Sequence, residues 1–179
     1  TYITAEYGNI ISSGSEVSLK QAIISALSQL IPTRSNILVV GLGNRDITPD
    51  AIGPLAVDRM FATRHFGRTL REQLGLEGLN SVSALIPGVL GKTGIEAVEI
   101  IRGTVQRTSP DAVIVIDALA ARHTERLCRT VQLCNTGISP GSGVENSRSE
   151  ISEAVLGVPV TAIGIPTVVD IRTLIYDLT

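Results

Sequence analysis

Two aspartates stand out because each follows a run of residues typical of a buried β-strand. Asp50 comes shortly after the apolar run 37–40 and a glycine-rich turn, and Asp117 comes directly after the apolar run 112–116. In an open sheet of parallel strands, the ligand site lies beyond the carboxyl ends of the strands. We therefore expect Asp50 and Asp117 to meet at one edge of a sheet and to form the active centre.

A pair of neighbouring carboxyl groups can carry out hydrolysis. Two such groups cannot both ionise easily, so they share a proton. The ionised group can take a proton from water, while the neutral group protonates or polarises a carbonyl. Each acid also has a purely structural explanation, because Asp50 could cap a helix and Asp117 could accept hydrogen bonds from loop amides. From spacing alone, both interpretations stay open.

The turn before Asp50 admits a second interpretation. Its sequence, Gly41-Leu42-Gly43, also begins the fingerprint of dinucleotide-binding proteins. That fingerprint needs a third glycine at the position that Asp46 occupies, where a helix would start against a pyrophosphate. Carboxylates at Asp46 and Asp50 would repel that phosphate. The turn therefore disfavours a nucleotide-binding module.

The composition narrows the class of protein. The 179 residues are 44% hydrophobic and 18% charged, which predicts one folded domain over residues 1–179. The formal net charge of −2 gives no electrostatic case for binding nucleic acid or a membrane. No leader pattern is visible, and Cys128 and Cys134 are expected to be free, buried thiols, as in a reducing cytoplasm. We therefore expect a cytoplasmic protein.

Strand and helix patterns alternate along the chain and predict parallel β-α units in an α/β sandwich. Predicted strands are 2–7, 37–40, 82–86, 112–116, 130–134 and 158–165, the last ended by Pro166. Predicted helices are 19–31, 50–63, 95–107 and a short one within 150–156, while 64–79 is expected to be a loop or a broken helix. Capping boxes are predicted at Ser18 with Gln21 and at Thr93 with Glu96.

Other residues could carry chemistry but have simpler explanations. His65 and His123 would be metal ligands only if the fold brought them to acids, so surface or capping roles are expected. The stretch 140–143, Pro-Gly-Ser-Gly, is either a substrate-facing loop or a plain surface turn. Asn44 is expected to hold the turn before Asp50 through side-chain to backbone bonds.

Several motifs together resemble the signatures of the germination protease family, the spore endopeptidases of spore-forming bacteria. In order along the chain, they are residues 40–44 with 48–54, 116–122, 134–138 with 140–144, and 164–170. The glycine turn alone would not be specific, but the ordered set covers most of the chain. Asp50 and Asp117 match the two acids implicated in that family.

The resemblance implies an atypical aspartic endopeptidase without a cofactor or metal. Such enzymes degrade small acid-soluble spore proteins in the spore core during germination. They are made as zymogens that lose a short N-terminal propeptide, and they assemble as homotetramers. The fold implied is a three-layer α/β sandwich with a twisted, mostly parallel central sheet, similar to hydrogenase maturation proteases.

Some features depart from this pattern. Family members are considerably longer, so we expect the single peptidase domain 1–179 to lack a C-terminal portion, and residues 171–173 differ from the family's Ala-rich continuation. The start at Thr1 would reflect propeptide removal or the choice of sequence boundaries. Two alternatives remain: a metal-dependent peptidase of the hydrogenase maturation type, which recognises nickel in its substrate, and a catalytically silent sporulation protein of the same fold.

Overall fold

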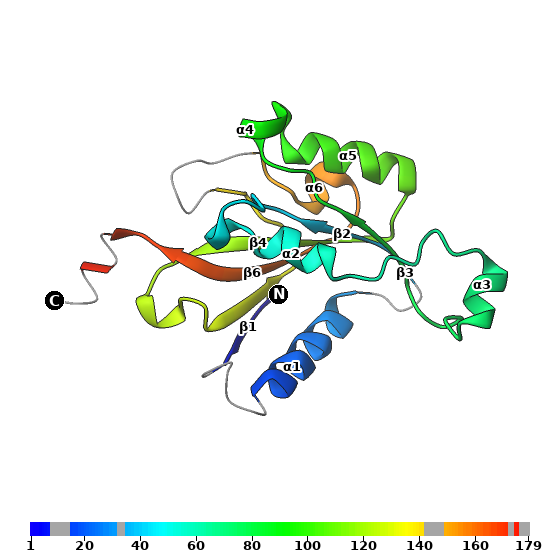
Figure 1. The fold of residues 1–179 in the computed structure, drawn as a ribbon, viewed down its shortest axis with the longest axis horizontal. Coiled ribbons are helices and arrows are strands. Elements are labelled where there is room, and N and C mark those ends of the chain that lie inside the picture. The colour runs from blue at the N-terminus through cyan, green and yellow to red at the C-terminus, as the bar shows by residue number, and fades with distance from the viewer. Residues whose placement is uncertain (8–14, 32–34, 142–148, 172–173, 176–179) are drawn as a thin grey trace.

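A six-stranded sheet forms the middle layer of the protein, with helices on both faces (Figure 1). The structure is a computed structural model, and it describes residues 1–7, 15–31, 35–141, 149–171 and 174–175. The strands are β1 (Tyr2–Glu6), β2 (Asn36–Gly41), β3 (Ser81–Leu85), β4 (Ala112–Ala121), β5 (Thr130–Cys134) and β6 (Val160–Val169). Their order across the sheet is β1-β5-β6-β4-β2-β3.

The sheet is mostly parallel, as expected. The pairs β2 with β3, β2 with β4, and β4 with β6 are parallel, whereas β5 runs antiparallel to both β1 and β6. Parallel neighbours are joined through helices, which must cover both faces of the sheet. The predicted α/β three-layer class is therefore confirmed.

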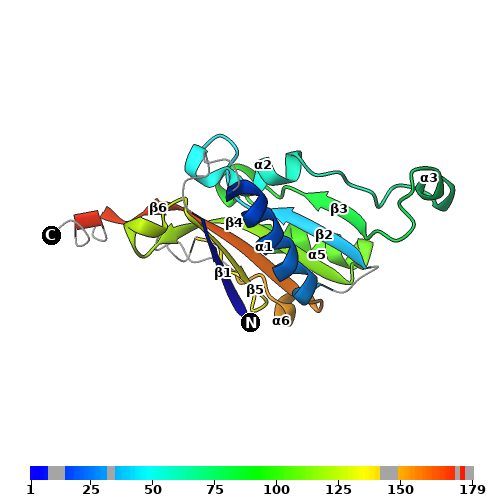
Figure 2. The ribbon, with the colours of Figure 1, turned by 90° about the horizontal axis from the view of Figure 1, so that it is seen from below.

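The helices are short apart from two. They are α1 (Ser15–Leu30), α2 (Ile52–Asp58), α3 (Arg68–Gln73), α4 (Leu90–Thr93), α5 (Ala97–Thr108) and α6 (Glu153–Leu156), with 3-10 turns η1 (Thr48–Asp50) and η2 (Thr124–Arg126). Figures 1 and 2 show α1 and α5 on opposite faces of the sheet. The helix α3 stands apart from the sheet, at the end of a long connection (Figure 2).

The apolar runs form strands because both of their faces are buried. In β4, Val113 and Val115 pack with α5 and α6, while Ile114 packs on the other face with Val57 of α2. The strand β2 alternates in the same way. A strand buried on both faces needs apolar residues at every position, which explains why these runs are continuous.

Two strands extend further than predicted. β4 does not end at Asp117 but continues to Ala121, and β6 passes through Pro166 to Val169. The added residues of β4 pair with the last part of β6, from Asp117 opposite Gly164 to Ala121 opposite Val169. The register shifts after Leu119, and such an irregularity is where a strand tolerates proline.

The helix boundaries also differ from prediction. α1 already begins at Ser15, so the capping box predicted at Ser18 is wrong. α2 ends before Thr63, because the backbone N–H groups of Thr63 and Arg64 donate to the Val82 carbonyl at 2.8 and 2.9 Å.

The second capping box is displaced by three residues. Glu96 caps α5, with its backbone N–H donating to Glu99 Oε2 at 3.0 Å, while Thr93 belongs to α4. The short helix α3 inside the stretch 64–79 agrees with the predicted broken helix.

Glycines allow α2 to begin in direct contact with the sheet. A Cβ on Gly53 would lie 2.2 Å from the Leu42 carbonyl oxygen and 2.5 Å from that of Ile116. A Cβ on Gly41 would lie 2.3 Å from the Gly53 carbonyl oxygen. All three obstacles are backbone atoms, which cannot rotate away. The helix can approach the ends of β2 and β4 only because both residues lack a side chain.

We expect Gly53→Ala to lower the free energy of unfolding by about 3 kcal/mol or more, since it overpacks a backbone contact. The matched control is Gly103→Ala on the exposed side of α5, where a Cβ meets nothing within 4 Å. That control is expected to be neutral or to stabilise by up to ~1 kcal/mol, because alanine favours helix. Urea denaturation measures both. Equal stability of the two variants would contradict the contact.

Candidate active site

The turn that carries Asp50 is held by hydrogen bonds from its own backbone to its own side chains. The Asn44 N–H donates to Asp50 Oδ2 at 2.7 Å, and Asn44 Oδ1 accepts from the Asp46 N–H at 3.1 Å. Gly43 has a φ of +113°, and a Cβ there would lie 2.0 Å from the Asp50 carbonyl oxygen. The turn therefore requires glycine at position 43. The expected role of Asn44 is confirmed.

Asp50 does not cap a helix. It is the last residue of η1, and the N-cap position of α2 is Ala51, which makes no side-chain cap bond. The half-buried carboxylate of Asp50 instead points back to the start of its turn, where it accepts the Asn44 N–H. The capping explanation for Asp50 is therefore wrong, and the carboxylate lies at the carboxyl end of β2.

Asp117 lies inside β4, and its side chain is buried. The residue is 6% exposed, and its Oδ1 accepts from the Ala118 N–H at 2.9 Å. It shares a face with Val113 and Val115, because alternate residues of a strand point to the same side. The last residue of β4 paired with β2 is Ile116, opposite Gly41. Asp117 is thus the first residue of β4 beyond the end of β2.

The structure packs the Asp50 turn against this part of β4. The Leu42 N–H donates to the Ile116 carbonyl at 2.8 Å, so the chain leaving β2 stays bonded next to Asp117. The turn η1 contacts both β4 and β6. Asp50 and Asp117 are therefore placed at the same edge of the sheet, on segments in contact. This is the edge at which ligands bind in open α/β sheets.

A side chain from β6 also ties down the turn. The Thr167 hydroxyl donates to the Pro49 carbonyl at 2.6 Å, across 118 residues of sequence. Pro49 directly precedes Asp50, and β6 is the strand that pairs with Asp117 through Gly164. The same strand therefore contacts both acid-bearing segments. Sequence reasoning missed Thr167, because a bond between such distant residues leaves no local signal.

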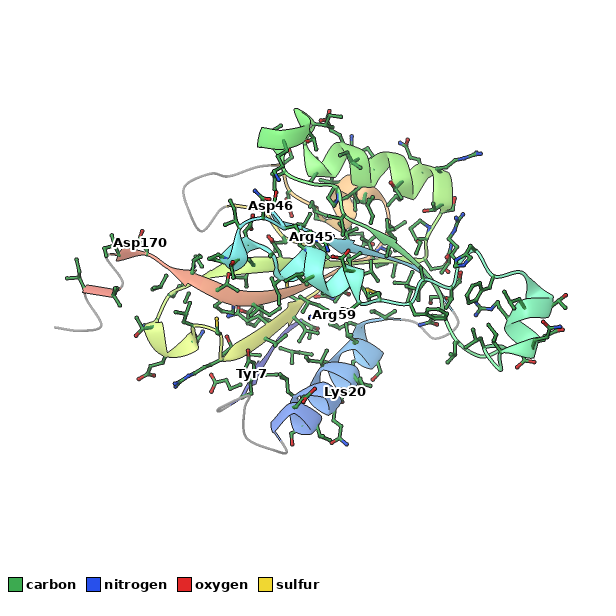
Figure 3. All side chains as sticks on the ribbon, in the orientation of Figure 1. Tyr7, Lys20, Arg45, Asp46, Arg59 and Asp170 are labelled. Atoms are coloured by element: carbon green, nitrogen blue, oxygen red, sulfur yellow. The ribbon has the colours of Figure 1, made fainter. Side chains whose placement is uncertain are left out.

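Ion pairs surround the turn on its solvent side. Arg45 pairs with Asp58 of α2 at 2.9 Å, and Lys92 of α4 both donates to and pairs with Asp46. Figure 3 shows Arg45 and Asp46 next to each other on this turn. The hydrogen bond from Lys92, followed by its charge, lowers the pKa of Asp46. The turn is thus linked to α2 on one side and α4 on the other.

The remaining candidates lie elsewhere. His65 packs edge-on against Phe66 with ring centroids 4.3 Å apart, and His123 lines a polar pocket beside η2. Within the described residues, no three His, Cys, Asp or Glu side chains converge as a metal cluster. Both cysteines are free, as expected, but the expectation that they are buried is wrong, because Cys128 is exposed and Cys134 is half-buried.

Of the stretch 140–143, positions 142 and 143 lie outside the described residues. No helix in the described part of the chain has the length and hydropathy to cross a membrane.

We expect Thr167→Val to loosen the turn that holds Asp50, since it removes the hydroxyl that binds Pro49. A lost neutral hydrogen bond is worth about 1 kcal/mol, so the Asn44 amide should exchange its hydrogen roughly fivefold faster. Hydrogen exchange followed by NMR measures this. Thr167→Ser is the control, because it keeps the hydroxyl. Unchanged exchange in Thr167→Val would show that the bond does not support the turn.

We expect Lys92→Met to raise the pKa of Asp46 towards its usual range. Because the folded-state pKa is lowered, any stabilisation by this pair is present at neutral pH and is lost as the pH falls through that pKa. Carboxyl NMR titration of Asp46 measures the change. Arg45→Gln is the control and should shift the pKa less, since the charge of Arg45 is a smaller cause. A larger shift in Arg45→Gln would contradict Lys92 as the main cause of the lowered pKa of Asp46.

Comparison with known proteins identifies the family. A family model described as germination protease matches residues 2–179. The germination protease of Caldanaerobacter subterraneus subsp. tengcongensis is 51% identical over 98% of this chain and 55% of its own length. That of Bacillus subtilis is 47% identical over 98% of this chain and 50% of its own length. The chain thus spans about half the length of these curated relatives.

A solved structure also aligns with the chain. The [NiFe] hydrogenase maturation protease HycI from Thermococcus kodakarensis aligns with a TM-score of 0.46 and 15% identity, over 87% of this chain and 94% of that one. The sequence relationship is much stronger, since the family model and relatives near 50% identity span almost the whole chain. On that basis, this chain belongs to the germination protease family.

Proposed function

We propose that the protein is an endopeptidase that degrades small acid-soluble spore proteins during germination, with Asp50 and Asp117 activating water. One observation carries this proposal: the turn of Asp50 packs where β4 first extends beyond β2, and Asp117 is the residue at that point. Family membership supports the peptide substrate. The resemblance of the motifs around both acids supports their roles.

The chemistry needs one ionised and one neutral carboxyl group. The ionised group takes a proton from water, and the oxygen of that water attacks the carbonyl carbon of the peptide bond. The neutral group donates a hydrogen bond to the carbonyl oxygen and then gives its proton to the leaving nitrogen as the C–N bond breaks. Burial of Asp117 strengthens these electrostatic interactions, because little water is present to screen them.

The structure supplies means to hold both groups in position. Asp117 is part of a strand paired on β6, and Asp50 is fixed by the Asn44 N–H and by the Thr167 bond to Pro49. Positioning of this kind lowers the barrier because the reacting groups need not be ordered during the reaction. Asn44 and Thr167 are therefore positioning residues in the proposed mechanism.

The proposal extends to the assembly and life cycle of the protein. The chain supplies the peptidase domain over residues 1–179, requires no cofactor, and acts in the spore core. The complete polypeptide is made as a zymogen and assembles as a homotetramer. Because the chain spans about half the length of its relatives, the complete polypeptide is the proper sample for measuring the oligomeric state by light scattering.

We expect Asp50→Asn and Asp117→Asn each to lower the rate of cleavage of a small acid-soluble spore protein about a hundredfold or more, as for the loss of a general acid or base. Asparagine keeps the shape of the side chain but cannot exchange the proton. Asp58→Asn is the matched control. It removes an acid that pairs with exposed Arg45, so the rate should change by about fivefold at most.

Circular dichroism should show that all variants are folded. Full activity in either Asp50→Asn or Asp117→Asn would contradict the paired-acid mechanism. Activity that is lost with a chelator and restored by nickel would instead support the metal-dependent alternative. A chain without any cleavage activity would support the catalytically silent alternative.

A further inference from the structure

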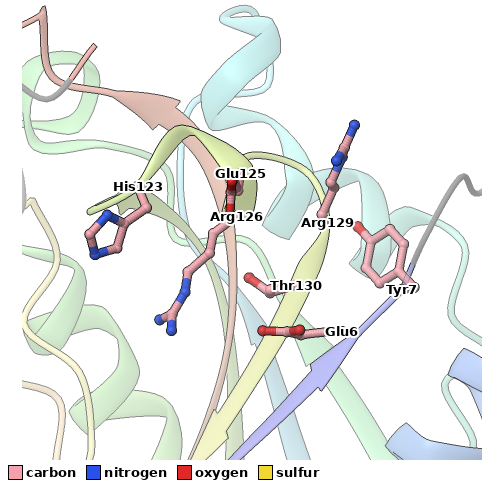
Figure 4. Close-up of a pocket in the computed structure, with 7 residues that line it drawn as sticks. All are labelled: Glu6, Tyr7, His123, Glu125, Arg126, Arg129 and Thr130. Atoms are coloured by element: carbon pink, nitrogen blue, oxygen red, sulfur yellow. The ribbon is translucent and has the colours of Figure 1, made fainter. Parts of the chain in front are cut away.

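A polar pocket opens at the same edge of the sheet as the two acids, beside η2. It has a volume of about 710 Å³ (Figure 4). Its lining comes from the end of β1, the start of β5 and the η2 segment: Glu6, Tyr7, His123, Glu125, Arg126, Arg129 and Thr130. The proposed hydrolysis uses none of these residues.

The strand register places the pocket on the face of the sheet that carries Asp117. Asp117 is opposite Gly164, Gly164 is opposite Gln132, and register partners point to the same face. Thr130 lies two residues from Gln132 along β5, so it shares that face, and Glu6 is its partner in β1. From strand spacings, Thr130 is roughly 12 Å from Asp117. An extended peptide covers that distance with about four residues.

Charges of both signs line the pocket without neutralising each other. Within the described residues, no ion pair involves Glu6, Glu125, Arg126 or Arg129. Figure 4 shows the side chains of Arg126, Thr130 and Glu6 turned towards the middle of the pocket. Two guanidinium groups and two carboxylates therefore remain available to groups on a ligand.

Thr130 gives an independent sign of a ligand. It is 2% exposed, and its hydroxyl oxygen has no hydrogen-bond partner among the described residues. A buried hydroxyl without a partner costs stability, so it usually has a reason. Tyr7 lines the same pocket. Its burial, and to a smaller extent the charge of Cys128, raises the pKa of Tyr7, so the phenol stays neutral and can donate a hydrogen bond. The pocket therefore offers neutral donors as well as charges.

We propose that this pocket binds a segment of the polypeptide substrate in which an acidic and a basic side chain project to the same side. The acidic side chain binds Arg126 and the Thr130 hydroxyl, and the basic side chain binds Glu6. Arg is well suited to this role because its planar group binds a carboxylate through two parallel hydrogen bonds. The substrate role rests on the proposed peptidase function, whereas binding itself does not.

Size and charge favour a peptide over smaller ligands. A pocket of about 710 Å³ exceeds the space that a single amino acid fills and lies within the range of sites that enclose larger ligands. A phosphate would be repelled by Glu6 and Glu125, which line the same pocket as the arginines. A peptide with both signs of charge pairs with Arg126 and with Glu6 at the same time.

The test uses the 179-residue chain and the peptide acetyl-Ala-Glu-Ala-Lys-Ala-amide, whose charged side chains project to one side when extended. The reference peptide replaces Glu and Lys by Gln. NMR titration gives both affinities and shows which backbone amides shift. We expect the charged peptide to bind about tenfold more tightly, with the largest shifts at Thr130 and its neighbours, as for a charge-assisted contact.

Variants then show which charged side chains of the pocket bind the peptide. Arg126→Gln and Glu6→Gln are each expected to remove most of the preference for the charged peptide while leaving the affinity for the Gln peptide unchanged. Arg107→Gln is the matched control, because Arg107 is exposed in the last turn of α5, away from the pocket. Thr130→Val should weaken binding and yet stabilise the fold, since it replaces an unpartnered buried hydroxyl.

Equal affinity for the two peptides would overturn the proposal, as would a preference that survives both Arg126→Gln and Glu6→Gln. Amide shifts confined to other surfaces would do the same. These outcomes are independent of cleavage. Binding without cleavage by the unsubstituted chain would contradict the proposed peptidase function alone, and cleavage without binding at the pocket would contradict this inference alone.

Discussion

The close contact of Gly53 with the carbonyl groups of Leu42 and Ile116 is the constraint on which the candidate site depends. It lets α2 begin directly against the ends of β2 and β4, and so it sets the path of the turn in between. The Leu42 N–H bonded to the Ile116 carbonyl keeps that path close to Asp117. With a side chain at position 53, the helix would have to move away from the sheet and take the Asp50 turn with it.

The central strands could be predicted from the sequence, but their full length could not. The apolar runs 37–40 and 112–116 are buried on both faces, which is a strong local signal. Beyond Asp117, the strand continues through residues that are mostly small and only half-buried. These residues form a strand because they pair with the end of β6, which comes much later in sequence. Proline usually ends a strand, but Pro166 lies inside β6 because the pairing of β6 with β4 is irregular at this point.

The edge location of the two acids followed from general topology, because the carboxyl ends of parallel strands share one side of a sheet. The residues that support the Asp50 turn could not be predicted in this way. Thr167 reaches Pro49 from the last strand, and Lys92 reaches Asp46 from α4. Neither contact has a sequence pattern, since each joins segments that only the completed fold brings together. Local turn chemistry was easier to predict, and Asn44 does hold the turn as expected.

The bond between Thr167 and Pro49 has a consequence for folding kinetics. It joins residues 118 positions apart, and β6 is the last strand of the sheet in chain order. Contacts between distant residues form slowly, because the entropy of a long loop is lost before the contact is gained. During synthesis from the N-terminus, the Asp50 turn therefore lacks the support of Thr167 until β6 has joined β4. An incompletely made chain would carry both acids without the arrangement proposed to make them active.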